Sequence, residues 1–328
     1  MALAAVCTAL TGEDGIEIRD WPVGAPGAGE IKVAVRAASV NFPDVLMVRG
    51  LYQHRPEPPF VPGSEAAGVV TDVGEGVSTF TPGDRVLLVG GSTFATELNA
   101  RVGGLTHRIP DEMPFDEAAA FTLTYGTSYN ALVTRGAVQE GEWVLVTGAA
   151  GGCGSAAVEI AKARGARVIA VVGGEEKAAL ATRLGADAVI DHTTVDALAP
   201  VVKELTGGHG VDVFCDNVGA ADARDFLRCM AWNGRFLVVG FASGDIPAFK
   251  ANQTILKCIS IVGVAYGMSA MLDPANAARE LEALFDWYRA GKVRPAVTAH
   301  FPLAQTADAM RVLQERRALG KVVVEMPA

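Results

Sequence analysis

The sequence predicts an α/β protein of two domains, an all-β domain and a doubly wound parallel sheet. Residues 1–122 are rich in Val, Gly and Pro, and their short alternating apolar runs are typical of several short strands. From Ala118 the pattern becomes helical, and apolar β-branched runs then alternate with helices, which indicates a parallel sheet covered on both faces. A chain of 328 residues that is 50% hydrophobic is long enough to form both cores.

The first domain is expected to span residues 1–122 and to be completed by residues 292–328. Alternating runs at 31–36 and 69–74 read as strands, and the turn sequence Thr81-Pro82-Gly83-Asp84 separates two such runs. Near the end of the chain, predicted strands at 297–301 and 322–326 flank a predicted helix at 304–314. This α+β segment is long enough to return to the first domain.

The second domain is expected to span residues 123–291. Its predicted strands cover residues 143–146, 167–172, 188–190, 211–215, 235–239 and 259–264. Its predicted helices cover residues 156–163, 175–184, 195–205, 220–231 and 276–290.

A glycine-rich turn lies between the strand at 143–146 and the helix that follows it. From Ala149 to Gly154 it reads Ala-x-Gly-Gly-x-Gly. Gly151 would let the backbone approach a pyrophosphate, and Gly154 would let the helix pack closely on the strand. A glycine string alone indicates only a turn. Between a strand and a helix N-terminus, which offers N–H groups and partial positive charge, it predicts a dinucleotide site.

Composition narrows the class of protein. The net charge of −9 argues against nucleic acid or an anionic membrane as the main partner. No apolar run is long enough to span a bilayer, and residues 1–10 lack the basic start of a signal peptide. The five cysteines are scattered, without a CxxC pair or zinc-site spacing, which favours a reduced, cytoplasmic protein without a metal site.

Further motifs accompany the glycine turn in a fixed order. They are Ala37-Ala38-Ser39-Val40-Asn41-Phe42-Pro43-Asp44, Arg49-Gly50-Leu51-Tyr52, Pro59-Phe60-Val61-Pro62-Gly63-Ser64-Glu65, Gly83-Asp84-Arg85-Val86, Tyr125-Gly126-Thr127-Ser128 and Gly320-Lys321-Val322-Val323. With these motifs the chain resembles the medium-chain dehydrogenase/reductase superfamily over nearly its whole length, and within it the zinc-independent quinone oxidoreductase (zeta-crystallin-like) branch. The resemblance implies a GroES-like β-barrel catalytic domain and a Rossmann dinucleotide-binding domain.

The resemblance also implies that zinc is absent. The zinc-bearing alcohol dehydrogenases of this superfamily carry Cys where this chain has Asn41 and His where it has Ser64. Their four-cysteine loop is missing after Val86, where only residues 87–96 occupy the region. Without a Lewis acid to hold an alkoxide, the chemistry expected is hydride reduction of a conjugated carbonyl.

The activity implied is an NADPH-dependent, zinc-independent reduction of quinones or α,β-unsaturated carbonyl compounds, with a small electrophile as substrate. An enoyl-thioester reductase is one alternative, in which Arg49, His54 and Arg55 beside Tyr52 would meet coenzyme A. A non-catalytic NADPH-binding protein is the other. The side chains of the cleft loops do not name one acceptor.

Three residues are candidate catalytic residues. In the resembling family, Asn41 and Tyr52 lie near the nicotinamide and the substrate, where an amide or hydroxyl donor would stabilise the oxyanion that forms on hydride transfer. The other interpretation is structural: Asn41 would cap a loop, and Tyr52 would pack on a surface. Water could also replace Tyr52 as the proton donor. The family places Thr127 at the nicotinamide end, although it could instead satisfy backbone groups at a helix start.

The cofactor preference depends on the end of the second Rossmann strand. NAD enzymes usually carry an acidic residue there, whereas Gly173 and Gly174 leave room for a 2′-phosphate. The resemblance assigns that phosphate to Lys177, which could also be an ordinary solvated residue. Relatives often have Ser in place of Gly174, and Glu175 and Glu176 would repel a phosphate unless they point away. The sequence therefore favours NADPH over NADH.

The remaining cofactor-binding candidates follow strands or lie in the glycine turn. His192 matches a family position beside the adenosine, and Cys153 is interpreted as a packing residue at a helix N-terminus. Ligands bind beyond the carboxyl ends of strands in open α/β sheets. The full set is Ala150, Gly151, Gly152, Cys153, Gly173, Gly174, Lys177, His192, Asn217, Val218, Val239, Gly240, Phe241, Val264, Ala265 and Tyr266.

The apolar run from Ile259 to Val264 is expected to be the edge strand of the parallel sheet. An exposed apolar edge favours pairing with another chain. The resembling family joins two sheets in this way, so a homodimer through Ile259 to Val264 is predicted.

Overall fold

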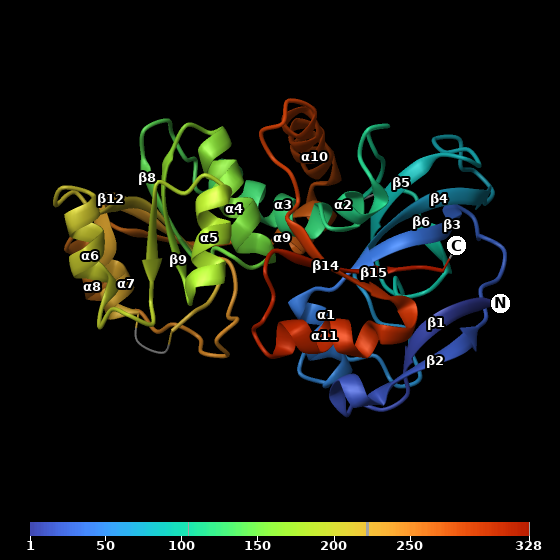
Figure 1. Ribbon diagram of the computed structural model, residues 1–328. Coiled ribbons are helices and arrows are strands. Elements are labelled where there is room, and N and C mark those ends of the chain that lie inside the picture. The colour runs from blue at the N-terminus through green and yellow to red at the C-terminus, as the bar shows by residue number, and fades with distance from the viewer. Residues whose placement is uncertain (104, 221–222, 328) are drawn as a thin grey trace. The chain divides into compact units, whose positions relative to one another are not determined.

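The computed structural model describes residues 1–103, 105–220 and 223–327. Its contacts divide the chain into two compact units. Unit 1 consists of Met1–Leu123, Ala270–Arg279 and Pro295–Ala328, and unit 2 consists of Thr124–Ser269 and Glu280–Arg294. Unit 1 thus combines the blue and cyan start of the chain with red segments from its end (Figure 1).

Unit 1 is built on antiparallel sheets. The larger sheet has the strand order β14-β15-β3-β4-β5-β7 with β6 also paired to β3, and a smaller sheet pairs β1 with β2. Only the β14–β15 pair is parallel among these pairs. The strands are β1 (Ala2–Cys7), β2 (Ile16–Trp21), β3 (Glu30–Ser39), β4 (Glu65–Val73), β5 (Arg85–Val89), β6 (Glu97–Arg101), β7 (Thr106–Arg108), β14 (Val297–Pro302) and β15 (Lys321–Glu325).

Alternation along β3 places one face of the larger sheet in the core of unit 1. Ile31, Val33 and Val35 are buried, whereas the residues between them are half-buried. The helical elements of this part are η1 (Gly12–Gly15), α1 (Phe42–Val48), α2 (Phe115–Ala119), η3 (Leu303–Gln305) and α11 (Thr306–Gln314). Helices α1 and α11, far apart in the sequence, contact each other (Figure 1).

Unit 2 contains a parallel sheet with the strand order β10-β9-β8-β11-β12-β13. This is the strand order of a dinucleotide-binding Rossmann fold, and the order of connection reverses between β8 and β11. The predicted doubly wound sheet is therefore confirmed. The strands are β8 (Trp143–Thr147), β9 (Arg167–Val172), β10 (Ala188–Asp191), β11 (Val211–Asp216), β12 (Met230–Val238) and β13 (Ser260–Gly263).

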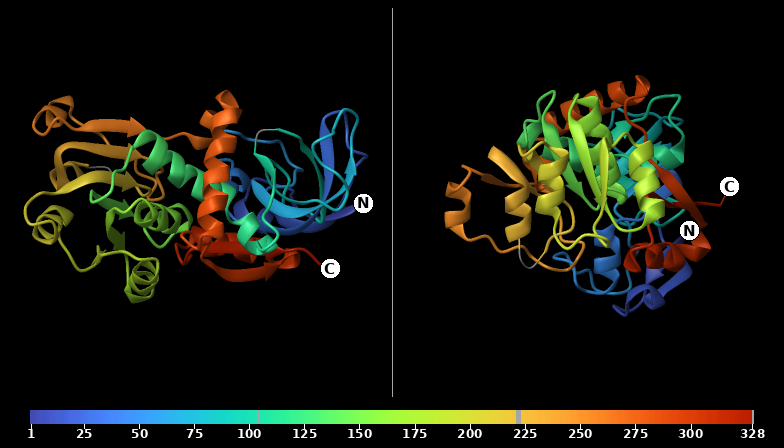
Figure 2. Two further views of the ribbon diagram at one scale, coloured as in Figure 1. Left: turned by 90° about the horizontal axis from the view of Figure 1, so that it is seen from above. Right: turned by 60° about the vertical axis from the view of Figure 1, so that its left-hand side comes forward.

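Helices lie on both faces of this parallel sheet (Figures 1 and 2). The helical elements between residues 122 and 289 are α3 (Thr122–Tyr129), the π-helix η2 (Asn130–Arg135), α4 (Gly152–Ala163), α5 (Glu175–Arg183), α6 (Leu198–Leu205), α7 (Arg224–Cys229), α8 (Ala251–Ile255), α9 (Tyr266–Leu272) and α10 (Pro274–Arg289), and parts of α3, α9 and α10 belong to unit 1. Phe214 of β11 and Phe236 of β12 belong to the same core cluster of unit 2, and their rings stack with centroids 4.8 Å apart. In the described parts of the chain, every helix is too short or too polar to cross a bilayer.

The helix predicted at 220–231 differs from the structure. Residues 221–222 lie outside the described residues, and α7 ends at Cys229, so that Met230 already begins β12. Val211 pairs with Met230 but Val213 pairs with Arg235, so residues of β12 are skipped in the register. Asn233 has a φ of 60° at this irregularity.

Candidate functional site

The glycine turn after β8 has the geometry of a phosphate-binding turn. Gly148 has a φ of 60°, and the extended Gly151 precedes the first residue of α4. A Cβ on Gly154 would lie 2.0 Å from the carbonyl oxygen of Gly148, so only glycine permits this close approach of helix and turn. The packing predicted for Gly154 is therefore confirmed. The turn opens onto the N-terminus of α4, which is suited to a pyrophosphate.

Asp216 joins the ends of β8 and β11 at the reversal of the strand order. Its buried Oδ1 accepts hydrogen bonds from the Thr147 hydroxyl at 2.7 Å and from the N–H groups of Val218 and Gly219 at 3.1 Å. Asn217 makes two hydrogen bonds to Thr147, both at 3.0 Å. Its backbone N–H donates to Thr147 Oγ1, and its Nδ2 donates to the Thr147 carbonyl oxygen. This network holds the loop that carries two of the candidate cofactor residues.

Other candidates from the sequence come together at this edge of unit 2. A Cβ on Gly148 would lie 2.9 Å from Val218 Cγ2, and a Cβ on Gly240 would lie 3.1 Å from the carbonyl oxygen of Asn217. Val239 bonds through its N–H to the Asp216 carbonyl oxygen at 3.0 Å, and Phe241 directly follows Gly240 with an exposed side chain. The loops after β8, β11 and β12 are thus adjacent.

Helix α3 is joined to the glycine turn and to α9. The Ser128 hydroxyl donates to the Cys153 carbonyl oxygen at 2.8 Å. A Cβ on Gly126 would lie 2.3 Å from the ring of Tyr266, which is buried and follows Val264 and Ala265. Thr127, between Gly126 and Ser128, is half-buried. It therefore belongs to the same part of unit 2 as the glycine turn.

The ends of β9 and β10 also meet. A Cβ on Gly173 would lie 2.8 Å from His192 Nε2, so these two candidates are neighbours. Gly174 is the N-cap of α5 with a φ of 89°, and Lys177 lies in the first turn of that helix. A side chain at Gly173 would therefore collide with the His192 ring, and glycine lets this ring lie against the end of β9. The turn around Gly151 and these two strand ends are the parts of unit 2 that would hold an adenine dinucleotide.

Asp191 is an acidic residue at this end that the sequence did not single out. Its Oδ2 accepts the Gly174 N–H at 3.1 Å, and its Oδ1 accepts the N–H and hydroxyl of Thr193 at 2.9 and 2.7 Å. These hydrogen bonds, first that of the Thr193 hydroxyl, hold the pKa of the Asp191 carboxyl below its usual value. The sequence feature that could have pointed to Asp191 is its position directly after the predicted strand at 188–190 and next to His192.

In unit 1, Asn41 lies at the N-cap of α1 and is buried. Its Nδ2 donates to Glu65 Oε1 at 3.0 Å and to the Ser39 carbonyl oxygen at 3.3 Å, and its Oδ1 accepts from Lys321 Nζ at 2.8 Å. Both hydrogens of Nδ2 are therefore directed at residues of unit 1. This arrangement fixes the orientation of the amide group.

Lys321 and Glu65 form a buried ion pair beneath Asn41. Lys321 Nζ lies 3.0 Å from Glu65 Oε1, and the two side chains are 3% and 2% exposed. Glu65 also accepts from the Ser39 hydroxyl and from the N–H of Leu123 at 2.9 Å. Lys321 stands directly before the apolar run of β15, and its role was not predicted although the Gly-Lys-Val-Val motif was noted.

Asp44 and Ser64 form a second polar pair in unit 1. The Ser64 hydroxyl donates to Asp44 Oδ1, and the backbone N–H of Asn41 donates to Oδ2 at 2.8 Å. Burial raises the pKa of Asp44 to about 7, although the hydrogen bonds from Ser64 and Asn41 and the charge of Lys321 act in the opposite direction. Asp44 is thus poised to gain or lose a proton near neutral pH.

Tyr52 follows α1 in a loop and is half-buried. Its backbone carbonyl oxygen accepts from Arg55 Nε at 3.2 Å. In the described residues, no hydrogen bond of its hydroxyl is found. Asn41 and Tyr52 belong to unit 1, whereas Thr127 belongs to unit 2.

The donors around Asn41 do not suit a zinc ion. An amide, a hydroxyl and a carboxylate already bonded to an ammonium group replace the thiolates and imidazoles that zinc prefers. Across the described ranges, no three His, Cys, Asp or Glu side chains gather at a spacing that would hold a metal.

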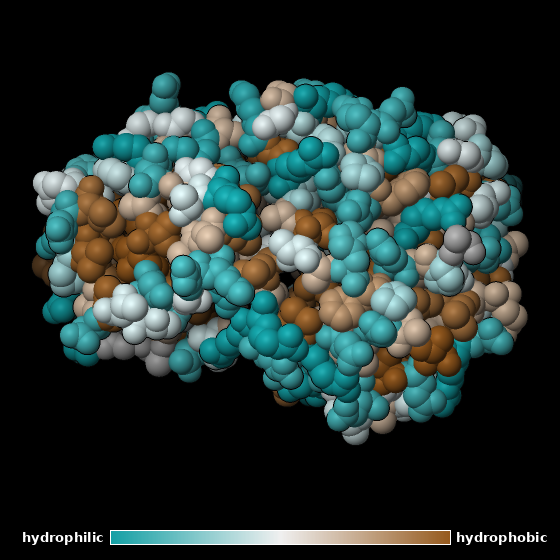
Figure 3. All heavy atoms as spheres, viewed as in Figure 1, coloured by the Kyte–Doolittle hydropathy of each residue, from teal (hydrophilic) through white to brown (hydrophobic). Residues whose placement is uncertain are grey.

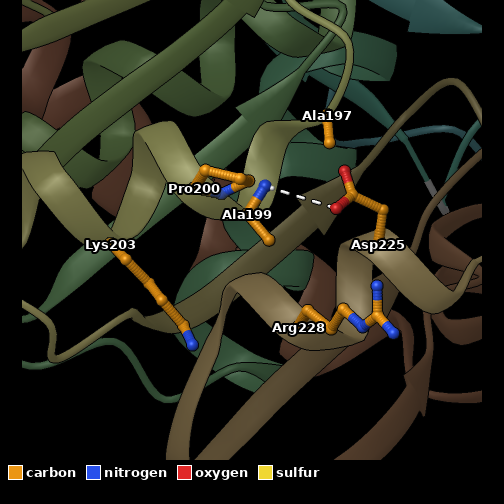
Figure 4. Close-up of a pocket in the computed structure, with 6 residues that line it drawn as sticks. All are labelled: Ala197, Ala199, Pro200, Lys203, Asp225 and Arg228. Atoms are coloured by element: carbon orange, nitrogen blue, oxygen red, sulfur yellow. Dashed lines mark hydrogen bonds between the residues drawn. The ribbon is translucent and has the colours of Figure 1, made fainter.

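A surface depression lies elsewhere, between α6 and α7 of unit 2. It is lined by Ala197, Ala199, Pro200, Lys203, Asp225 and Arg228 (Figure 4). Apolar surface gathers at this end of unit 2 (Figure 3). The charged ends of Lys203 and Arg228 do not converge, and Asp225 accepts the backbone N–H of Ala199 (Figure 4). Asp225 also accepts the backbone N–H of Leu198. None of the candidate site residues lines this depression.

Comparison with known proteins decides the family. A family model described as alcohol dehydrogenase GroES-like domain matches residues 27–107, and one described as zinc-binding dehydrogenase matches residues 152–284. The quinone oxidoreductase-like protein 2 homolog of Nematostella vectensis is 38% identical over 302 residues, which cover 91% of this chain and 82% of that protein. The chain belongs to the medium-chain dehydrogenase/reductase superfamily. It is an oxidoreductase related to the quinone oxidoreductase-like proteins, with the GroES-like and Rossmann folds predicted from the sequence.

Two solved structures are similar to this oxidoreductase over nearly its whole length. A mycobacterial protein in complex with NADPH is 31% identical with a TM-score of 0.91, covering 99% of this chain and 100% of that one. A 2-haloacrylate reductase is 31% identical with a TM-score of 0.86, with the same coverage.

Proposed function

We propose that this oxidoreductase is an NADPH-dependent, zinc-independent reductase of quinones or α,β-unsaturated carbonyl compounds. The observation that carries the proposal is the ammonium group of Lys321 bonded to Asn41 and Glu65, where a zinc enzyme would need metal-binding donors. Such a site cannot hold an alkoxide on a metal. It suits acceptors in which resonance already spreads the developing negative charge.

When bound, NADPH supplies a hydride to the acceptor. The residues of this chain bind and orient the reactants and stabilise the oxyanion. From the family resemblance we assign the Tyr52 hydroxyl to the substrate and Thr127 to the nicotinamide. The amide of Asn41, held by Lys321, Glu65 and Ser39, fixes the start of α1 from which the Tyr52 loop follows.

The preference for NADPH is supported by the end of β9. Gly173 and Gly174 put no acidic side chain at the end of β9, and Lys177 carries a positive charge in the first turn of α5. Asp191 directs its carboxylate to Gly174 and Thr193. The mycobacterial neighbour of similar fold was solved with NADPH.

The proposal predicts steady oxidation of NADPH with a panel of quinones and conjugated ketones. NADPH should give a kcat/KM at least about tenfold higher than NADH, a difference of about 1.4 kcal/mol. Absorbance of the reduced cofactor measures both reactions, and Lys177→Ala should reduce the preference without affecting the reaction with NADH. A preference for NADH would overturn the role given to Gly173, Gly174 and Lys177. Tight NADPH binding without turnover of any acceptor would favour a non-catalytic NADPH-binding protein.

An enoyl-thioester reductase is the second candidate. The exposed His54 and Arg55 next to Tyr52 favour it, since they could meet the phosphates of coenzyme A. Arg49 does not add to this charge, because its Nη2 is paired with Glu13 at 2.8 Å. The similarity to a 2-haloacrylate reductase also favours a conjugated carboxyl compound. An enoyl thioester preferred over quinones in the same panel would decide for this candidate.

We further propose that the protein is a homodimer joined through β13. In the described structure this strand pairs only with β12, and Ile261 is 37% exposed on it. A charge at this edge opposes pairing with another strand, so Ile261→Lys should convert the dimer to a monomer in size-exclusion chromatography with light scattering. Leu205→Lys, at a similarly exposed leucine of α6 (40%), is the matched control and should leave the mass unchanged. A monomeric wild-type protein would refute the dimer.

A further inference from the structure

The carboxyl group of Asp44 is connected to a more exposed part of unit 1 through Ser64. Asp44 lies in the first turn of α1 and is fully buried, whereas Ser64 is half-buried. Asp44 Oδ2 is held by the backbone N–H of Asn41, and Oδ1 faces the Ser64 hydroxyl. Ser64 and Asn41 thus lie on either side of the same acid.

A carboxyl and a hydroxyl in contact have two hydrogen-bonded states. When Asp44 is ionised, the Ser64 hydroxyl must donate its hydrogen to the carboxylate. When Asp44 is protonated, the acid donates to Ser64 Oγ, and the hydroxyl hydrogen of Ser64 is free to point away from Asp44. The donor that Ser64 presents therefore depends on the proton of Asp44.

Two charged groups act on Asp44, and they oppose each other. Lys321 from β15 favours the ionised form, and Glu65 from β4 favours the protonated form. The charges on the other elements that contact α1 are paired elsewhere, Glu13 with Arg49, and Arg311 with Asp14 and Asp308. Since Lys321 and Glu65 also neutralise each other, the environment lets Asp44 hold a proton while Ser64 remains bonded to it.

We propose that Ser64 and Asp44 are the proton relay of the reductase, with Ser64 donating to the substrate and Asp44 supplying Ser64. This rests on the proposed function. For a conjugated ketone, hydride transfer forms a C–H bond at the β-carbon, and the electron pair of the C=C bond moves to give an enolate. The O–H bond of Ser64 breaks as its proton passes to the enolate, and the proton of Asp44 passes to the Ser64 oxygen. Solvent then reprotonates the Asp44 carboxylate, so each turnover consumes one hydride and one proton.

The relay predicts a pH profile that depends on Ser64. In the wild-type enzyme, kcat should fall as the pH rises through about 7, because Asp44 then loses the proton that it supplies. Ser64→Ala should lower kcat by about 100-fold with little change in KM, and should remove both this fall and the solvent deuterium isotope effect. Ser64→Thr keeps a hydroxyl and should restore both. Ser78→Ala, at an exposed serine of unit 1, should behave as the wild type.

Tyr52→Phe tests the rival donor. If Tyr52→Phe removes the isotope effect and the pH dependence while Ser64→Ala keeps them, Tyr52 is the proton donor and the relay is refuted. Carbon-13 NMR of the Asp44 carboxyl in the wild-type protein measures the pH at which this group titrates. This measurement requires neither turnover nor a variant. Titration near pH 7 supports the relay, and titration in the ordinary carboxyl range near 4 overturns it. Failure of the proposed function would differ, because the wild-type enzyme would then reduce no acceptor at all.

Discussion

Replacing Lys321 with methionine should lower the free energy of unfolding by about 3–5 kcal/mol. The substitution removes the positive partner of Glu65 and leaves a buried carboxylate that only neutral donors solvate. It also removes the hydrogen bond to Asn41 Oδ1. Chemical denaturation measures the loss, and NADPH oxidation should decline with it, because the Asn41 amide is no longer fixed.

Two controls separate this effect from a simple loss of charge. Lys162→Met removes the ion pair with Asp187 at 2.8 Å, which is about one-third exposed, so it should cost no more than about 1 kcal/mol. The double variant Lys321→Met/Glu65→Gln removes both buried charges and should recover part of the stability. Equal losses in Lys321→Met and Lys162→Met would show that the pair around Glu65 does not hold unit 1 together.

The contacts of Lys321 explain why this part of the site was missed from the sequence. The partner Glu65 lies 256 residues away, so only the folded sheet brings them together. By contrast, β9 and β11 were predicted to within one residue, because a buried parallel strand is an uninterrupted apolar run with turns at both ends. Local patterns thus determine the elements, and tertiary pairing determines which polar side chains are buried.

The paired ends of β9 and β10 show the same limit at shorter range. Gly173 and His192 were chosen separately from the sequence, and the structure brings them together because β9 and β10 are paired. Asp191 was overlooked because its contact with Gly174 depends on that pairing. The order of the elements can thus be predicted from local sequence patterns, whereas the charge balance at the candidate cofactor site cannot.

Replacing Gly154 with alanine should weaken NADPH binding by at least about tenfold and destabilise unit 2 by about 1–3 kcal/mol. The added Cβ would lie 2.0 Å from the oxygen and 2.7 Å from the carbon of the Gly148 carbonyl, and 2.8 Å from the Ala149 Cα. All three atoms belong to the backbone, so no rotamer change can relieve the contact. Helix α4 must move from β8, and its N-terminus moves with it. Thermal unfolding and fluorescence titration with NADPH measure the two effects.

The variant Gly151→Ala tests whether the turn contacts NADPH, separately from the packing of α4 on the turn. A Cβ at Gly151 would lie 3.4 Å from the Gly148 oxygen, an ordinary contact, and the φ of −87° is open to alanine. Its thermal midpoint should match that of Gly90→Ala, where an added Cβ meets no atom within 4 Å. Its affinity for NADPH should still fall, because the methyl group occupies the space into which the pyrophosphate must come. If Gly151→Ala binds NADPH as tightly as the wild type, the phosphates do not lie on this turn, and Gly154 serves only to pack the helix.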